Sequence, residues 1–237
     1  MDGADVVVNG VGAVDEIVAA AVQVGAIYID TVRDRAFVQE VAERYRYART
    51  PIVAGCPPEA VTGDMAAALA AENVGGVCHR LDVHHDLGGW TGVGAPSGVE
   101  TRHVWFPHGV RETVPVPWLE QVHVPRHVPG VPVTVTATPE GTGRAVLSTL
   151  AVAVAADGER CLAAIVADDI ELLGARMLAG LAELVEGEGP MAPAEAVAPE
   201  RFLDHVRDTG EPRALEWAIS TPSGWFTPLT DPDIGGA

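Results

Sequence analysis

The first fifty-odd residues alternate between short apolar runs and helix-like segments, and this alternation constrains the fold more than any other feature. The runs 6–9, 27–30 and 52–54 are short and apolar, as expected of strands buried on both faces. The segments 15–24 and 34–45 between them space their apolar residues as amphipathic helices do. Because strands that alternate with helices pair in parallel through right-handed crossovers, the pattern predicts three parallel strands with helices between them.

Beyond residue 76 the pattern becomes one that is typical of an antiparallel or mixed sheet. Segment 77–85 alternates as a strand does, and segments 146–155 and 161–167 alternate on either side of the turn signal Asp157-Gly158. Residues 170–185 have the apolar spacing of an amphipathic helix. The sequence therefore predicts the α/β class, with a parallel sheet followed by an α+β lobe that contains a mixed or antiparallel sheet.

Charge and composition limit the functions open to this chain of 237 residues. The formal net charge is −18 and the pI is near 4.6, which argues against nucleic acid and anionic membranes as partners. No apolar run is long enough to cross a membrane, and the N-terminus lacks the pattern of a signal peptide. Cys56, Cys78 and Cys161 are isolated, so we expect neither a disulfide framework nor a cysteine zinc site. These features favour the cytoplasm.

The chain contains no lysine, and every basic side chain other than histidine is arginine. This absence excludes Schiff-base chemistry, a lysine general base and the phosphate-binding lysine of P-loop proteins. It also excludes the tyrosine–lysine pair of short-chain dehydrogenases. The use of arginine alone, with abundant Ala, Val and Gly, is typical of a GC-rich genome and needs no functional cause.

Five short segments, taken in order, carry a resemblance to a known family. They are Asn9-Gly10-Val11-Gly12, Asp30-Thr31-Val32-Arg33-Asp34, Ala54-Gly55-Cys56-Pro57-Pro58-Glu59, Pro115-Val116-Pro117-Trp118 and Pro193-Ala194-Glu195-Ala196. In this order the segments resemble saccharopine dehydrogenase-like oxidoreductases, which usually have Asn-Cys-Val-Gly-Pro at the first position. The backbone pattern is kept while several polar positions differ, and the resemblance extends from Asp5 to about Leu203.

The resemblance implies a fold, a reaction and a set of site residues. The fold is an incomplete Rossmann-like lobe at 1–75, an α+β lobe for substrate binding and dimerisation at 76–229, and a frayed tail at 230–237. The reaction is NAD(P)-linked reduction of a small molecule at the carboxyl ends of the parallel strands. The residues implied to bind the cofactor are Asn9, Gly10, Gly12 and Asp30, and those implied to bind the substrate are Arg33, Cys56 and Glu59.

One element of such enzymes is missing from this sequence. No G-x-G-x-x-G turn, which seats a dinucleotide pyrophosphate on a helix N-terminus, occurs near the N-terminus. We therefore expect the chain alone to bind NADPH weakly or not at all. Two alternatives stay open. The chain is a reductase that depends on further polypeptide, or it is a cofactor-free relative, such as an isomerase or cyclase of a specialised pathway or a non-catalytic partner subunit.

The segment 77–85 and the histidines provide further candidates. Alternation places Arg80, Asp82 and His84 on one face of a strand. This face is either a substrate-binding site, in which Arg80 and His84 hold a carboxylate, or a solvated sheet surface with a local ion pair. Other histidines lie at 103, 108, 123 and 127, but their spacing matches no ligand template, so no metal is expected. The Gly-rich segment 86–101 is either a loop that closes over a ligand or a hinge.

The first strand has a consequence for assembly. An incomplete parallel sheet leaves Val6–Asn9 at an exposed edge, and this strand carries no Lys or Pro that would hinder pairing. We expect Val18, Val22 and Val24 of the following helix to add apolar surface beside it. The sequence therefore predicts a homodimer, or a partner protein, that covers this edge.

Overall fold

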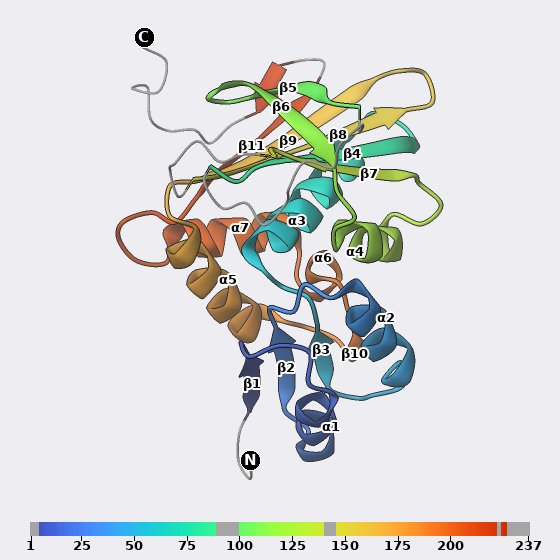
Figure 1. The fold of residues 1–237 in the computed structure, drawn as a ribbon, viewed down its shortest axis with the longest axis vertical. Helices are drawn as coiled ribbons and strands as arrows, with labels where there is room; N and C mark the ends of the chain where they lie inside the picture. Colours follow the sequence, from blue (N-terminus) through green and yellow to red (C-terminus); the bar gives the residue numbers. More distant parts are fainter. Residues whose placement is uncertain (1–4, 89–99, 140–145, 222–223, 227–237) are drawn as a thin grey trace.

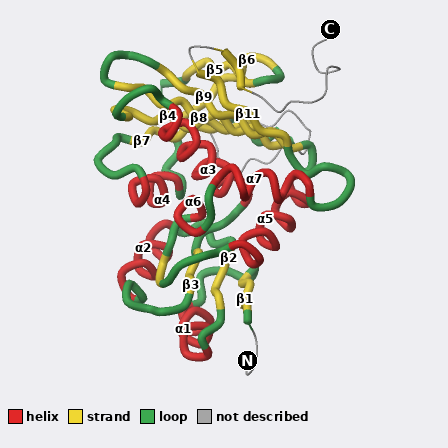
Figure 2. The backbone as a smooth tube through the Cα atoms, turned by 180° about the vertical axis from the view of Figure 1, so that it is seen from behind, coloured by secondary structure: helices red, strands yellow, loops and turns green. Residues whose placement is uncertain are grey.

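The computed structural model describes residues 5–88, 100–139, 146–221 and 224–226. Two sheets lie at opposite ends of an elongated molecule, and helices fill the space between them (Figure 1; Figure 2). A four-stranded parallel sheet lies at the end that carries the N-terminus, and an eight-stranded mixed sheet forms the other end. This mixed α/β architecture confirms the predicted fold class.

The parallel sheet takes its strands from both halves of the chain. It consists of β1 (Val6–Asn9), β2 (Ile27–Asp30), β3 (Pro51–Val53) and β10 (Gly189–Pro190), in the order β1-β2-β3-β10. All neighbouring strands are parallel, as predicted for the first three, and β3 begins one residue earlier than expected. Because β10 comes from residues far along the chain, the sheet is not completed by the first lobe alone.

Two helices cover one face of this sheet. Helix α1 (Asp15–Val24) begins at the predicted carboxylates and ends at Gly25, whose φ of 74° is the left-handed conformation that glycine adopts most readily. Helix α2 (Arg35–Arg44) begins as predicted, because the Asp34 side chain accepts hydrogen bonds from Ala36 N and Phe37 N. Of the residues expected to add apolar surface beside β1, Val18 is instead fully buried in the core, whereas Val24 is exposed as expected.

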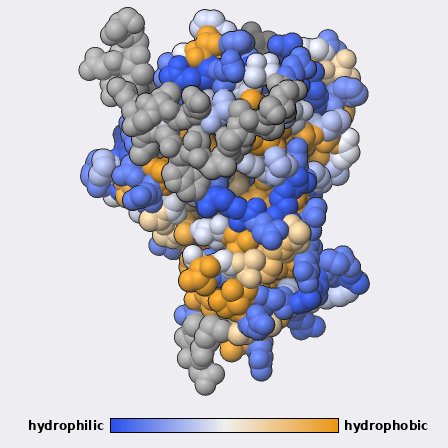
Figure 3. Space-filling model, viewed as in Figure 1, coloured by the Kyte–Doolittle hydropathy of each residue, from blue (hydrophilic) through white to orange (hydrophobic). Residues whose placement is uncertain are grey.

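The outer strand of the parallel sheet is open on one side. Strand β1 is terminal in the sheet order, as predicted, and Val8 on it is 50% exposed. Val24 on α1 and Val11 after β1 are exposed as well. Figure 3 shows apolar side chains gathered over this end of the molecule. The described residues thus leave an apolar strand edge without a pairing partner.

The mixed sheet has the strand order β12-β11-β9-β8-β4-β7-β6-β5. Among its described pairings only β4 with β7 is parallel. The predicted hairpin is confirmed in β8 and β9, with Gly158 in the turn at a φ of 90°. The strands are β4 (Cys78–Asp86), β5 (Arg102–Phe106), β6 (Gly109–Pro115), β7 (Val133–Ala137), β8 (Leu147–Ala155), β9 (Arg160–Ala167), β11 (Glu216–Thr221) and β12 (Gly224–Phe226).

Helix α3 (Pro58–Asn73) lies between the two sheets and is buried from Glu59 to Ala70. Its alanines allow close packing against β4, β8 and β9. We expected a helix from Met65 to Glu72 with Thr62 or Asp64 as its N-cap. The helix instead begins seven residues earlier, at Pro58. Proline is tolerated in the first turn because the N–H that it lacks would have no partner within the helix there.

Four further helices complete the layer between the sheets. They are α4 (Glu120–His127), α5 (Ile170–Leu184), α6 (Pro193–Ala196) and α7 (Pro199–Asp208). Helix α5 was predicted, and it is capped by Asp169 as expected, with Leu173, Met177 and Leu181 in its buried stripe. In the described part of the chain no helix is long and apolar enough to cross a membrane. Most of the Gly-rich segment 86–101 and the whole tail 230–237 lie outside the described residues.

Candidate functional site

The carboxyl ends of the three N-terminal parallel strands lie side by side. Asn9 ends β1, and its side-chain amide donates to Gly12 O at 2.8 Å and to the Tyr28 hydroxyl at 3.0 Å. Its oxygen accepts from Val11 N at 3.0 Å. An added side-chain carbon at Gly10 or Gly12 would meet nothing within 4 Å, so the turn that Asn9 holds is open on its outer side.

Asp30 ends β2 and ties this strand to the loop after β3. Its carboxylate accepts hydrogen bonds from Gly55 N at 2.7 Å, Val32 N at 3.0 Å and the Tyr28 hydroxyl at 2.8 Å. Burial raises the pKa of Asp30 and is also the largest cause of the raised pKa of Tyr28. Since Asp30 is fully buried, a cofactor hydroxyl would have to displace one of these bonds to reach it.

The substrate residues implied by the resemblance lie at the start of α3. Arg33 forms an ion pair with Glu59, with 2.6 Å between Nε and Oε1. Glu59 is in the first turn of α3, where the helix dipole favours a carboxylate. Cys56 precedes the helix, and its thiol donates to Val53 O at 3.3 Å. Burial, with the nearby Asp30 and Asp64 charges, raises the pKa of Cys56 well above its usual value, so it is a poor nucleophile.

A chain of hydrogen bonds continues from α3 into the mixed sheet. The Thr62 hydroxyl donates to Glu59 O at 2.9 Å and lies 2.8 Å from the Thr149 hydroxyl. Thr149 lies 3.0 Å from His85 Nδ1, and His85 Nε2 lies 2.7 Å from Glu120 Oε1. All of these side chains are buried, and those of His85 and Glu120 are 0% exposed. We call this the inner relay.

Packing encloses the acidic end of the inner relay. An added side-chain carbon on Gly63 would lie 2.6 Å from Glu120 Cγ, so only glycine lets α4 approach α3 this closely. The Trp118 ring lies 5.2 Å from the His85 ring. Glu120 Oε2 and Ser148 Oγ are buried without a hydrogen-bond partner.

A second buried pair involves Asp64, which lies two residues after Thr62 on α3. Asp64 accepts from His127 Nε2 at 2.7 Å and from Ala194 N at 2.8 Å, so it joins α3 to α4 and α6. Burial raises the pKa of Asp64, but the bond and the charge of His127 outweigh it, and the net pKa is lowered. For His127 burial lowers the pKa, and Asp64 more than reverses this, so the net pKa is raised. The pair is an ionic link between three helices.

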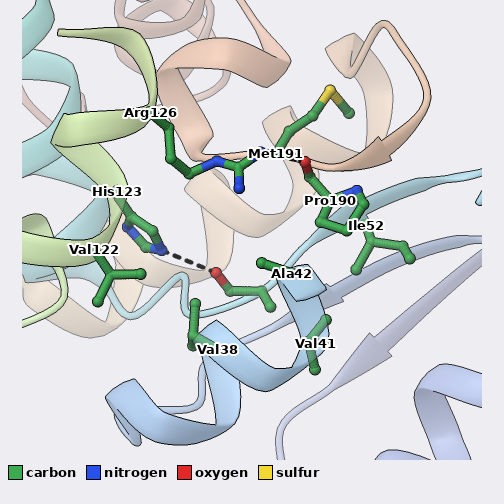
Figure 4. A pocket seen from close by; sticks show the side chains of 10 residues that line it. Val38, Val41, Ala42, Ile52, Val122, His123, Arg126, Pro190 and Met191 are labelled. Atoms are coloured by element: carbon green, nitrogen blue, oxygen red, sulfur yellow. Dashed lines mark hydrogen bonds between the residues drawn. The ribbon is translucent and has the colours of Figure 1, made fainter. Parts of the chain in front are cut away.

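Figure 4 shows a small pocket between α2, β3, α4 and β10. Its volume is about 20 Å³, enough for a water-sized group. His123 forms part of its wall, with Nε2 donating to Ala54 O at 3.1 Å, and Nδ1 is buried without a partner. Arg126 binds Glu195 and Pro190 O beside it. The remaining lining residues are Val38, Val41, Ala42, Ile52, Ala54, Val122, Pro190 and Met191.

Arg80 and His84 lie on the outer face of β4, away from α3. Arg80 pairs with Asp82, with 3.0 Å between Nε and Oδ2. His84 Nδ1 lies 2.8 Å from the Thr136 hydroxyl, which donates to Thr113 at 3.0 Å, and Thr113 donates to Arg102 O at 3.3 Å. Burial is the largest cause that lowers the pKa of His84 to about 4. We call this chain of hydrogen bonds the outer relay.

Another cluster lies at the end of β4. The Asp86 carboxylate is bound by His108 Nε2 at 2.7 Å and by Arg111 Nε at 3.0 Å. It also accepts from Gly88 N at 3.1 Å and from the Thr138 hydroxyl at 3.3 Å. With these donors Asp86 joins the end of β4 to the β5–β6 hairpin and to the residue after β7.

The structure thus brings some predicted site residues together and separates others. Asn9, Gly10, Gly12, Asp30, Arg33, Cys56 and Glu59 gather where β1, β2 and β3 end. Arg80 and His84 lie on the outer face of the mixed sheet. Sequence reasoning missed His85, Thr149 and Glu120. The only signal for them was His85 itself, on a mostly apolar face of the strand that also includes His79, and it did not identify the partners.

No family model matches the chain, and no curated protein is significantly similar to it. The resemblance to saccharopine dehydrogenase-like oxidoreductases therefore rests on the order of its sequence segments.

Proposed function

We propose that this protein is a saccharopine dehydrogenase-like oxidoreductase that reduces a small molecule in the cytoplasm with NAD(P)H as the hydride source. The observation that carries the proposal is the meeting of the ends of β1, β2 and β3 at the start of α3. Ligands of open α/β sheets bind at the carboxyl ends of the strands. Helix α3 then leads directly to the mixed sheet, and this connection supports the proposal that the mixed sheet belongs to the substrate-binding lobe.

The cofactor requires polypeptide beyond the described edge of the parallel sheet. Asn9 and Asp30 are engaged in bonds between strand ends, and no phosphate-binding glycine turn is present near the N-terminus. We propose that a second copy of the chain, or a partner protein, covers the edge at β1. The half-exposed Val8 and the terminal place of β1 support such an association.

The test is a titration with NADPH and NADH, in which calorimetry and nucleotide fluorescence measure binding. It compares the isolated chain with its assembly with a second copy or a partner protein. Weak or no binding to the isolated chain, with micromolar binding to the assembly, is the expected result. Absence of binding in every form contradicts the oxidoreductase proposal.

Association at β1 has its own test. Light scattering at tens of micromolar concentration measures the mass, and amide hydrogen exchange measures protection of β1. We expect a dimer with a protected strand, and Val8→Arg should yield monomers. Val77→Arg, at an exposed position just before the mixed sheet, is the matched control. A monomer whose β1 amides exchange freely contradicts the assembly proposal.

A second candidate is a cofactor-free isomerase or cyclase. The observation in its favour is the inner relay, because His85 and Glu120 are acid–base groups supplied by this chain alone. A non-catalytic partner subunit is the remaining form of this alternative. Turnover of a small molecule by the chain without any nicotinamide cofactor favours the isomerase or cyclase.

A further inference from the structure

The inner relay has a fixed direction because it ends on a backbone carbonyl. Glu59 O can only accept, so the Thr62 hydroxyl donates its single hydrogen to it. Thr62 must then accept from Thr149, whose own single hydrogen is used in that bond. Thr149 therefore accepts from His85, and His85 Nδ1 carries a hydrogen.

This direction determines how many protons lie between His85 and Glu120. With a hydrogen on Nδ1, a neutral His85 would present a bare Nε2 to Glu120 Oε1 at 2.7 Å. If Glu120 were ionised, two acceptors would then face each other in a fully buried site. A proton between them removes this repulsion and leaves the pair without net charge. The pair is either imidazolium with carboxylate or imidazole with carboxylic acid.

The next turn of α4 carries a second buried group that lacks a hydrogen-bond partner. His123 lies one turn after Glu120, so the two side chains share a face of the helix. Since Ala54 O can only accept, His123 Nε2 carries a hydrogen, and Nδ1 is left as the buried atom without a partner. Glu120 Oε2 is also buried without a partner. Each of the two atoms needs a donated hydrogen, which water can supply.

We propose that His85 and Glu120 share one buried proton and form an acid–base site that exchanges it, through His123, with the pocket between α2 and α4. When the proton leaves, water passes it to His123 Nδ1, and the ring releases its Nε2 proton from Ala54 O to water in the pocket. Imidazole and carboxylate remain at His85 and Glu120 with one negative charge, and the reverse transfer restores the pair. Reduction of a carbonyl or imine by hydride needs such a proton, and this last role alone rests on the proposed function.

The proton count is tested by nuclear magnetic resonance on protein with ¹⁵N-labelled histidine. We expect His85 Nδ1 to be protonated at neutral pH. Either Nε2 carries the second proton, or infrared spectra show a carboxylic acid band that disappears in Glu120→Gln. Glu112→Gln, at an exposed position of β6, is the matched control. A bare Nδ1, or a bare Nε2 without a carboxylic acid band, overturns the proposal.

The exchange route is tested by measuring how long the shared proton stays between His85 and Glu120 before it exchanges with water. His123→Gln keeps a donor for Ala54 O but cannot pass a proton from one ring nitrogen to the other. We expect exchange to slow by about a hundredfold, the scale of a positioned acid–base group. His79→Gln, at an exposed position, is the control. An unchanged lifetime in a folded His123→Gln variant overturns the route.

These measurements use the protein without nicotinamide cofactor. A failed NADPH titration therefore contradicts the proposed function and leaves the proton count untouched. A wrong proton count contradicts the acid–base site and leaves cofactor binding untouched.

Discussion

His84 and His85 are neighbours in sequence, yet they point to opposite faces of β4 and end two similar relays. On the outer face His84 Nδ1 meets Thr136, then Thr113, then a backbone carbonyl. On the inner face His85 Nδ1 meets Thr149, then Thr62, then a backbone carbonyl. Only His85 has a carboxylate at Nε2, and no such partner of His84 lies among the described residues.

This difference shows that the state of a buried histidine depends on its hydrogen-bond partners as well as on its burial. Both rings are buried, and both present Nδ1–H to a threonine. For His84 burial dominates and the pKa is lowered to about 4, so the ring stays neutral. His85 differs in its partner, because its Nε2 lies 2.7 Å from Glu120 Oε1. The inner face is therefore the better candidate for proton transfer.

The largest expected effect comes from removing the partner on the inner face. Glu120→Ala leaves His85 without its acidic partner and opens a cavity beside Gly63, so we expect a loss of about 3–5 kcal/mol in the free energy of unfolding. Glu120→Gln should lose less, because its amide can donate to His85 Nε2. Urea denaturation measures both variants against Glu112→Ala. If Glu120→Ala lowered the free energy of unfolding no more than Glu112→Ala does, the contact between His85 and Glu120 would contribute little to stability.

Burial of His84 on the outer face predicts that the stability of the fold depends on pH. The folded pKa of His84 is about 4, below its ordinary value of 6.5, so the unfolded chain binds more protons between these values. Stability should therefore fall as pH drops from 6.5 to 4, by up to about 3 kcal/mol, and this contribution should be constant below the folded pKa. His84→Asn should remove that part of the slope in denaturation curves, whereas His79→Asn should not. An unchanged slope would show that His84 is not the neutral buried group described here.

A smaller effect tests how closely the inner relay is packed. Gly63→Ala places a carbon 2.6 Å from Glu120 Cγ, so α4 must shift, at a cost of about 1–3 kcal/mol. Gly76→Ala is the matched control, because its added carbon would lie 3.7 Å from Ala155 Cβ, an ordinary contact. The comparison is made by denaturation and by the His85 ring resonances. Equal stability of the two variants would mean that the contact at Gly63 relaxes freely.

Sequence reasoning predicted local features well and distant pairings poorly. The strands at 6–9 and 27–30 and the cap at Asp34 follow from periodicity and capping, which act within a few residues. The start of α3 was missed, because Pro57-Pro58 resembles a loop, whereas the helix begins at Pro58, where proline is tolerated in the first turn. Glu120 binds a histidine 35 residues earlier, and no local pattern encodes a contact at that separation.

The residues of the site show the same limit. Strand alternation correctly placed Arg80 and His84 on one face and His85 on the other. It could not show which face meets a helix, since that depends on the packing of α3 and α4 against the mixed sheet. The face with Arg80, Asp82 and His84 looked more functional in the sequence than the opposite, mostly apolar face, which includes His79 and His85.

The smallest expected effect lies at Arg80, the exposed end of the outer face. Its side chain is 53% exposed and pairs with Asp82 at 3.0 Å, a geometry that solvent and salt screen. Arg80→Gln should change the free energy of unfolding by less than about 1 kcal/mol, and less still at high salt. Arg201→Gln, which breaks another exposed pair, is the control in the same denaturation series. If Arg80→Gln cost as much as Glu120→Ala, the two faces would contribute equally to the stability of the fold, and the contrast between the relays would fail.

If instead Arg80 binds a substrate carboxylate, its replacement should weaken binding of a carboxylate ligand while stability stays unchanged. This result would separate binding from folding on the outer face.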